Sequence, residues 1–453
     1  MAPLMASRVR AHLMAQLACL GRHTVTGLLT TTGQTESDWS ADYRLYSRRK
    51  VDLHALFDPV RQRLCQNQEA DATIVVALDD TRLRKSGRHI PGARYTRDPL
   101  GPPFHTNFIR AQRFLQISLA AVNNHDPLQT RMVPVDIVHA PPAAKAPREA
   151  TAEELKGHRQ KEKQQALGQV AVERLTRLRK ALDDDGHAGR VLWSVVDGGY
   201  TNATVLKKLP PRTRLSGRIR KDAKLFFAPV DQPATGRPRI YGEQAPTPEQ
   251  LRTDADIPWQ PVKAFACGKE HTFKVKSIAP VFWKKAGVAM PLRLLVIAPL
   301  AYRLRKGDRL LYRQPAFLIC TDPQADLQQI LQTYIYRWDI ETNFRDEKTL
   351  LGLGQAQVRH QKSVQAVPTL ATAAYAMLLC AACQSAFKGN SFAPKWRPKQ
   401  PPRPSTASLI NRLRYELWAD RIRFDDFVQH PQDNTKSTKL FPSLSSSIFR
   451  AAS

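Results

Sequence analysis

The sequence predicts an α/β protein built on a mixed β-sheet with flanking helices, and three observations support this prediction. Four runs rich in β-branched and apolar residues have the composition of buried strands: 73–79, 113–121, 132–138 and a run that ends at Asp197. A long helix is expected between the third and fourth strands, from Thr151 to about Leu182, because Thr151 and Glu154 form a capping-box pattern. A further amphipathic helix is expected at residues 334–348.

Composition and charge restrict the class of protein. The chain has 453 residues, of which 42% are hydrophobic, enough for a proper core. Its 69 Lys and Arg residues against 40 Asp and Glu give a net charge of +29, which predicts a polyanionic partner. The six cysteines are scattered, and the sequence shows neither a signal peptide nor an apolar run long enough to span a membrane. We therefore expect a cytoplasmic protein that does not bind membranes.

One helix carries an unusual combination of side chains. Tyr334, Arg337, Glu341 and Lys348 stand at positions i, i+3, i+7 and i+14. At about 100° per residue these four side chains fall within an arc of roughly 60°. A carboxylate among two cations and a phenol suits a site in which the acid holds a metal and its neighbours hold a phosphate. One flank of the same helix is expected to face the core: Ile340, Phe344 and Leu351.

Partners for Glu341 are expected at strand ends. The run 73–80 ends in Asp79 and Asp80, and the later strand ends at Asp197, which two glycines follow. A buried strand that stops at an Asp presents the carboxylate at the edge of the sheet. Plainer roles remain open: Asp80 could cap a turn, Asp197 could form an Asp-Gly turn, and Glu341 could form a surface ion pair with a neighbouring arginine.

Asp80, Asp197 and Glu341 together resemble the catalytic triad of DDE transposases, which have an RNase H-like core. The spacing Tyr-x-x-Arg-x-x-x-Glu-x-x-x-x-x-x-Lys is similar to the signature of a large bacterial insertion-sequence superfamily, known as YREK after these residues. Other stretches, among them RHTVTGLLTTTG and RLSGRIRKDAKLF, also resemble that group, and the likeness covers residues 21–387.

The resemblance implies a five-stranded RNase H-like sheet in which the first and fourth strands are parallel neighbours, so that Asp80 and Asp197 can reach one ion. It favours Asp80 over Asp79, because the family's first acid directly precedes a threonine. Since three crowded carboxylates repel one another, the site is expected to bind two Mg2+ or Mn2+ ions, about 3.5–4 Å apart. The implied activity is that of a DNA transposase, which cuts the ends of a mobile element and joins them to target DNA, by a cut-and-paste route.

The resemblance also implies roles in DNA binding. Tyr334 and Arg337 would hold the phosphate near the cut, and Lys348 would bind the backbone just beyond it. In relatives that cut through a DNA hairpin an aromatic residue stacks on a flipped base. Phe317, in the predicted strand 315–320, is the candidate, with a place in the core as the alternative, and Trp283 is another candidate. Three cations are plausible phosphate contacts or simply part of a solvated strand face: Arg218, Arg220 and Lys221.

The predicted organisation has five segments. A helical N-terminal segment either binds DNA ends or caps the core, two segments form the catalytic core around a β-rich insertion, and a basic Pro-rich linker leads to a helix and a loose tail. In order these segments are 1–70, 71–210 (core), 211–315 (insertion), 316–390 (core, with the signature helix) and 391–453.

Two other functions fit the same sequence. One is a structure-selective nuclease with an RNase H-like core, and the other is a transposase-derived DNA-binding protein without catalytic activity. For the transposase, the expected partners are double-stranded DNA, as terminal inverted repeats and as target, and a second copy of the chain when two ends are paired.

Overall fold

The computed structural model describes residues 3–418, apart from residues 37, 49–51, 99–100, 103, 106, 124–125, 232–237, 267, 288, 306 and 385–402. Of the predicted segment 391–453, only residues 403–418 are therefore described, and the predicted tail and most of the predicted linker lie outside the described residues.

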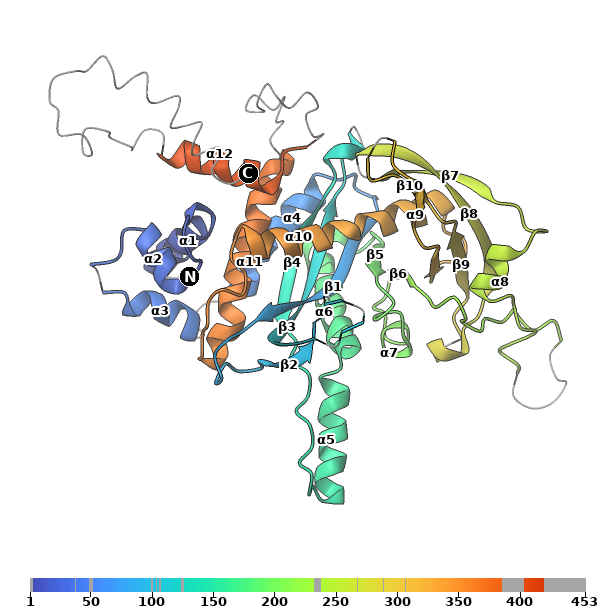
Figure 1. The fold of residues 1–453 in the computed structure, drawn as a ribbon, viewed down its shortest axis with the longest axis horizontal. Coiled ribbons are helices and arrows are strands. Elements are labelled where there is room, and N and C mark those ends of the chain that lie inside the picture. Colours follow the sequence, from blue (N-terminus) through green and yellow to red (C-terminus); the bar gives the residue numbers. More distant parts are fainter. Residues whose placement is uncertain are drawn as a thin grey trace, which may run out of the picture.

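A mixed β-sheet forms the centre of the protein, with helices against it (Figure 1). Five of its strands lie in the order β4-β3-β1-β5-β6, with β1 antiparallel to β3 and parallel to β5. The predicted parallel pairing of the first and fourth strands of the core is therefore confirmed. The bounds are β1 Ile74–Arg84, β3 Phe108–Ala121, β4 Arg131–His139, β5 Leu192–Val196 and β6 Thr213–Arg218.

The sheet is larger than the five strands predicted: in the described part of the chain it has ten. The strands of the predicted insertion continue the core sheet, because β12 pairs antiparallel with β6 and is followed by β9, β8 and β7. At the other side, β2 pairs with the first part of β3. The additional strands are β2 Arg94–Arg97, β7 Gln260–Ala266, β8 Lys269–Val281, β9 Leu292–Ile297 and β12 Ala316–Cys320, and a separate ribbon pairs β10 (Ala301–Tyr302) with β11 (Leu311–Tyr312).

The helix predicted at 151–182 is present as two helices, α5 (Ala152–Gln164) and α6 (Leu167–Leu182). Thr151 and Glu154 form the predicted capping box at the start of α5. Helix α6 packs its apolar face on the core, whereas α5 has no buried residue and projects from the body of the protein (Figure 1). A short helix, α7 (Ala203–Leu206), follows β5, and another, α8 (Pro248–Thr253), lies within the predicted insertion.

The single helix expected at residues 334–348 is instead divided between two consecutive helices, α9 (Leu327–Tyr336) and α10 (Trp338–Thr349), which meet at Arg337. As predicted, Ile340, Phe344 and Leu351 are buried. The buried amide of Asn343 fixes α10 to the sheet, since its Nδ2 donates to Ser118 Oγ at 3.2 Å and to the Met132 carbonyl at 2.9 Å.

The remaining helices gather around α11 (Gln361–Gln384), which packs on β4. By length and composition alone α11 could cross a membrane, but 61% of its apolar window is buried inside the protein. The N-terminal helices contact α11 and share an apolar cluster with its Leu370, so they form a cap on the core. The bounds are α1 Pro3–Ala18, α2 Val25–Thr31, α3 Ser40–Ser47, α4 Asp58–Gln66 and α12 Thr406–Trp418, with a short 3-10 turn at Leu53–Phe57.

Helix α10 carries a buried carboxyl group, that of Glu347. Glu347 is 1% exposed, and the Gln116 amide nitrogen, in the orientation that satisfies its hydrogen bonds, lies 3.2 Å from each carboxylate oxygen. Burial raises the pKa of Glu347 to about 8. Because the folded protein holds this proton more tightly than the unfolded chain, its free energy of unfolding should fall as pH rises from about 4.5 to about 8.

We expect Glu347→Gln to remove this part of the pH dependence, since glutamine keeps the shape and an acceptor for Gln116. The variant should gain stability relative to the wild type as pH rises through this window, by roughly 2–4 kcal/mol in total. Urea unfolding of both proteins at pH 5, 6.5 and 8 measures the difference. Equal pH slopes would contradict the assignment of a neutral, buried Glu347.

Candidate active site

The two neighbouring acids of β1 point to opposite faces of the sheet. Strand β1 does not end at them: its pairing with β3 continues from Val76 through Asp79 and Asp80 to Arg84. Side chains alternate between the faces of a regular strand, so the two carboxylates separate. The expectation that these acids mark the end of a strand is therefore wrong.

Asp80, the acid predicted to be catalytic, faces Tyr200. The Tyr200 hydroxyl, itself buried, donates to Asp80 Oδ1 at 3.0 Å, and Arg82 Nη1 lies 3.6 Å from Asp80 Oδ2. Asp80 thus ties β1 to the segment that follows Asp197. Its contacts are a tyrosine and an arginine, and they do not include Arg337 or Glu341.

Asp79 lies beside Asp197. Leu78 of β1 is the register partner of Val196 of β5, so Asp79 and Asp197 are the next residues along two parallel neighbouring strands. Burial, followed by the negative charge of Asp197, raises the pKa of Asp79 to about 7. The geometry therefore brings together Asp79 and Asp197, and it leaves Asp80 on the other face.

The turn that holds Asp197 is fixed by its own hydrogen bonds. Asp197 Oδ1 accepts from the backbone N–H of Gly199 at 2.8 Å, and the Thr201 hydroxyl donates to the Asp197 carbonyl at 3.0 Å. A Cβ at Gly217 of β6 would overlap that hydroxyl, so only glycine lets the turn pack this closely. The Asp-Gly turn foreseen as a plainer role is present, and it positions the carboxylate beside Asp79.

Arg337 connects the acids of the strands to the acid of the helix. Its Nη1 lies 3.3 Å from Asp79 Oδ2, and its Nη2 donates to Glu341 Oε1 at 2.9 Å. The Arg337 side chain is 7% exposed, whereas that of Glu341 is 45% exposed. Through Arg337, carboxylates from β1 and α10 are held at one place, next to Asp197.

Two aromatic rings flank this arginine. The guanidinium carbon lies 5.8 Å from the ring centre of Tyr334 and 5.6 Å from that of Trp338. Tyr334 is buried, and burial raises the pKa of its hydroxyl while the charges of Arg337 and Arg218 act in the opposite direction. Trp338 is 52% exposed, and the sequence analysis did not single it out.

The other predicted DNA contacts are in different situations. Lys348, half-buried on α10, has its pKa lowered by burial and lies in the field of Arg82 and Arg84. Arg218 is exposed and lies next to Gly198, close to the Asp197 turn. Arg220 and Lys221 lie further along the chain, on the surface. Arg220 pairs with Asp222, and Lys221 is exposed.

Phe317 does not face solvent. It is 7% exposed and belongs to the main apolar core, and its strand β12 lies between β6 and β9. The alternative role considered for this residue, a place in the core, is the one the structure shows. In this arrangement its ring is not available to a DNA base.

In the described part of the chain no three His, Cys, Asp or Glu side chains lie close enough together to hold a metal ion. The carboxylate of Glu341 accepts a hydrogen bond from Arg337. Asp79 and Asp197 nevertheless fit a hard divalent cation, since both supply oxygen ligands and they are the next residues after the paired positions Leu78 and Val196 of two neighbouring strands.

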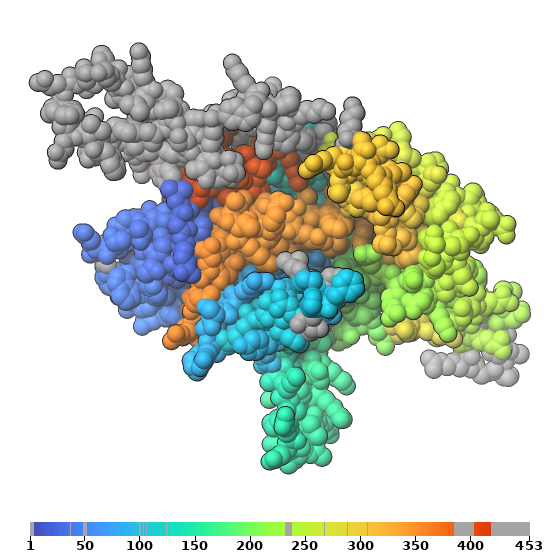
Figure 2. All heavy atoms as spheres, in the orientation of Figure 1, coloured from blue at the N-terminus to red at the C-terminus, as the bar shows by residue number. Residues whose placement is uncertain are grey.

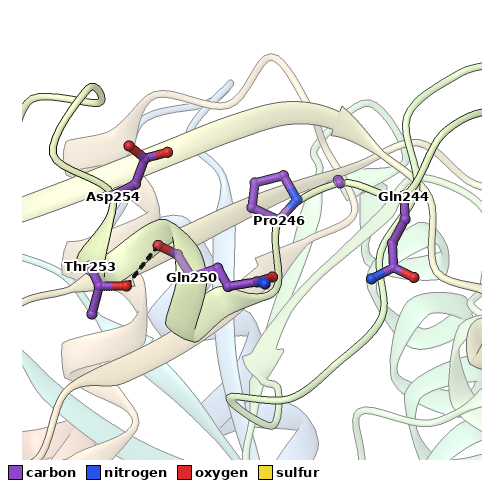
Figure 3. A pocket seen from close by; sticks show the side chains of 6 residues that line it. Gln244, Pro246, Gln250, Thr253 and Asp254 are labelled. Atoms are coloured by element: carbon purple, nitrogen blue, oxygen red, sulfur yellow. Dashed lines mark hydrogen bonds between the residues drawn. The ribbon is translucent and has the colours of Figure 1, made fainter.

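The surface also has a hollow whose lining includes none of the residues of this site. It is lined by residues of and around α8, and Thr253 Oγ1 donates there to the Gln250 carbonyl at 3.1 Å (Figure 3). It is open and polar, and it contains none of the acids or cations discussed above.

Carboxylates on neighbouring strands supply the oxygen ligands that hard divalent cations prefer, and such ions catalyse the cleavage of phosphodiesters. Residues 4–268, more than half of the chain, match the family of DDE superfamily endonucleases, and the chain belongs to this family. The matched residues include Asp79 and Asp197 and end before Glu341. Family membership indicates a metal-dependent, DNA-cleaving activity of the transposase kind. No curated protein matches the chain.

We expect Arg337→Ala to destabilise the protein by roughly 1–3 kcal/mol, because it leaves the partly buried Asp79 without its cation. A matched control is Arg412→Ala on α12: Arg412 also pairs with a glutamate four residues on, at the same 2.9 Å, but at an exposed site. That control should change stability by no more than about 0.5 kcal/mol. Urea unfolding at pH 8 without divalent cations compares the two, and similar losses would contradict the central role of Arg337.

Proposed function

We propose that the protein is a DNA transposase that binds the ends of a mobile element, cleaves the DNA strands there and joins the freed ends to target DNA. The observation that carries this proposal is the Arg337 bridge between Asp79 and Glu341, beside Asp197. Arg337 thus connects an acid of β1 with an acid of α10, and Asp197 lies beside the first of them. The helical signature spacing and the net charge of +29 support a DNA substrate.

We assign the first metal-binding carboxylate to Asp79, in place of the Asp80 favoured by the resemblance. Asp79, Asp197 and Glu341 would hold two Mg2+ or Mn2+ ions. Such ions would supply activation of water and of a DNA 3′-hydroxyl and stabilisation of the leaving oxygen. Asp80 acts through Tyr200, by holding β1 against the segment that carries Asp197.

The cations around the acids are suited to position DNA. Arg337 and Tyr334 lie where the scissile phosphate would approach the carboxylates, and Arg218 lies beside the Asp197 turn. Lys348 lies about two helical turns beyond Glu341, so it would contact the backbone away from the cut. Arg220 and Lys221 remain proposed phosphate contacts further along the surface.

We expect Asp79→Asn, Asp197→Asn and Glu341→Gln each to reduce DNA cleavage at least about 1,000-fold, because each removes a metal-binding charge. End binding should remain within a few-fold in all three. The matched control is Asp80→Asn, which keeps an oxygen for the Tyr200 hydroxyl and should retain most of the activity. Single-turnover cleavage of duplex DNA that carries the element's ends, with Mg2+ and with EDTA, measures these rates.

Two results would overturn the assignment. Cleavage that survives in Asp79→Asn and is lost in Asp80→Asn would return the catalytic role to Asp80. Cleavage that survives in all variants, or in EDTA, would remove the proposed site altogether.

Strand joining separates a transposase from a nuclease with the same core. With pre-cleaved ends that carry a free 3′-hydroxyl, we expect covalent joining to a supercoiled plasmid in Mg2+ or Mn2+, seen as a new labelled product on a denaturing gel. Two ends should join to one plasmid if two protomers pair them. Hydrolysis without any joined product would favour the structure-selective nuclease.

A further inference from the structure

Two large aromatic side chains are exposed on the ribbon formed by β2 and the first part of β3. Tyr95 is 76% exposed and Phe108 is 60% exposed. The cross-strand pairs are Tyr95 with Arg110 and Arg97 with Phe108, and directly opposed residues share a face of a ribbon. All four side chains therefore project from one face, on which aromatic rings alternate with arginines. We call this face the β2–β3 face.

The charge around the β2–β3 face is strongly positive. Residues 81–113 contain eight Arg and Lys residues and a single acid, Asp98. Asp98 is paired with Arg84, at 2.6 Å. Arg110 is held in place by donating to the carbonyls of Gly87 and Arg88, while Arg97 is exposed. A polyanion is the partner that such a surface fits.

The β2–β3 face continues the face of the sheet that carries Asp79. Phe108, Arg110 and Gln116 occupy alternate positions of β3, and Gln116 is the cross-strand partner of Asp79. Helix α10 lies over the same face, since Glu347 contacts Gln116. In Figure 2 the blue-cyan atoms of this segment lie against the orange atoms of the signature helices, on one side of the molecule. A DNA strand held at the acids could therefore pass onto the aromatic rings.

We propose that the β2–β3 face binds an unpaired stretch of DNA, with bases stacked on Tyr95 and Phe108 and the backbone along Arg97. Duplex DNA presents its phosphates and the edges of its bases, whereas the faces of the bases are available only in an unpaired strand. Exposed rings interleaved with cations are the arrangement that single-strand-binding surfaces use. The proposal rests on the proposed function for the identity of the nucleic acid, and it adds the class of DNA structure that the site accepts.

The test uses the full chain in EDTA, so that no cleavage occurs. Fluorescence anisotropy measures the affinity for a labelled single strand and for the duplex of the same sequence, and 2-aminopurine in the single strand reports stacking by quenching. The variants are Tyr95→Leu/Phe108→Leu, which keeps apolar side chains without rings, and Tyr95→Phe/Phe108→Tyr, which keeps the rings. The control is Tyr312→Leu, an aromatic that is 62% exposed on the separate β10–β11 ribbon.

The double leucine variant should bind the single strand at least about tenfold more weakly and lose the quenching, because each base–aromatic stack contributes substantially to affinity. The affinity of this variant for the duplex should stay within about twofold of the wild type. The variant that keeps the rings and the Tyr312→Leu control should bind the single strand with an affinity within about twofold of the wild type. Unchanged single-strand binding by the leucine variant, or an equal loss for single strand and duplex, would overturn the proposal. Since no metal is present, this result is independent of whether Asp79→Asn abolishes cleavage.

Discussion

The ion pairs that Arg337 makes with Asp79 and Glu341 are the interaction on which the site depends. They connect a strand and a helix that are 258 positions apart in sequence, at a place where Asp197 adds a further negative charge. Like-charged groups at one place destabilise the fold unless a cation offsets them. The surrounding structure holds this geometry: β5 pairs beside β1, the Asp197 turn packs on Gly217, and Asn343 fastens α10 to β3 and β4.

The features of the fold that depend on nearby residues could be predicted from the sequence, and those that depend on remote residues could not. The order of strands and helices in the core, the Thr151 cap and the apolar flank of α10 depend on nearby residues, and they were predicted correctly. The preference for Asp80 over Asp79 rested on Thr81, which directly follows Asp80. Alternation along the strand puts the two acids on opposite faces, but it does not say which face carries the site. The proposal of Asp79 rests on long-range contacts, the pairing of β1 with β5 and the ion pair with Arg337.

Long-range pairing also explains the other differences. The interval between the second and third acids contains alternating runs that predict strands, but no local feature indicates that β12 joins β6 and continues the core sheet. That junction places β12 inside the sheet, and the ring of Phe317 packs in the main apolar core. In contrast, Tyr95 of β2 stays exposed. Side chains project from the faces of a sheet, so burial of an aromatic residue depends on what covers its face, which the local sequence does not indicate.

Under the proposed function, Arg337 would take part in both metal binding and DNA binding. In the structure its two terminal nitrogens are engaged by Asp79 and Glu341, the carboxylates proposed to bind metal. A guanidinium donates most strongly to one set of acceptors at a time, and carboxylate and phosphate compete for the same planar donors. If a metal held these acids, Arg337 would be free to donate to a phosphate, whereas the proposed backbone contacts of Lys348, Arg97 and Arg218 would need no such change. Metal should therefore matter most for placing the scissile phosphate and least for holding the rest of the DNA.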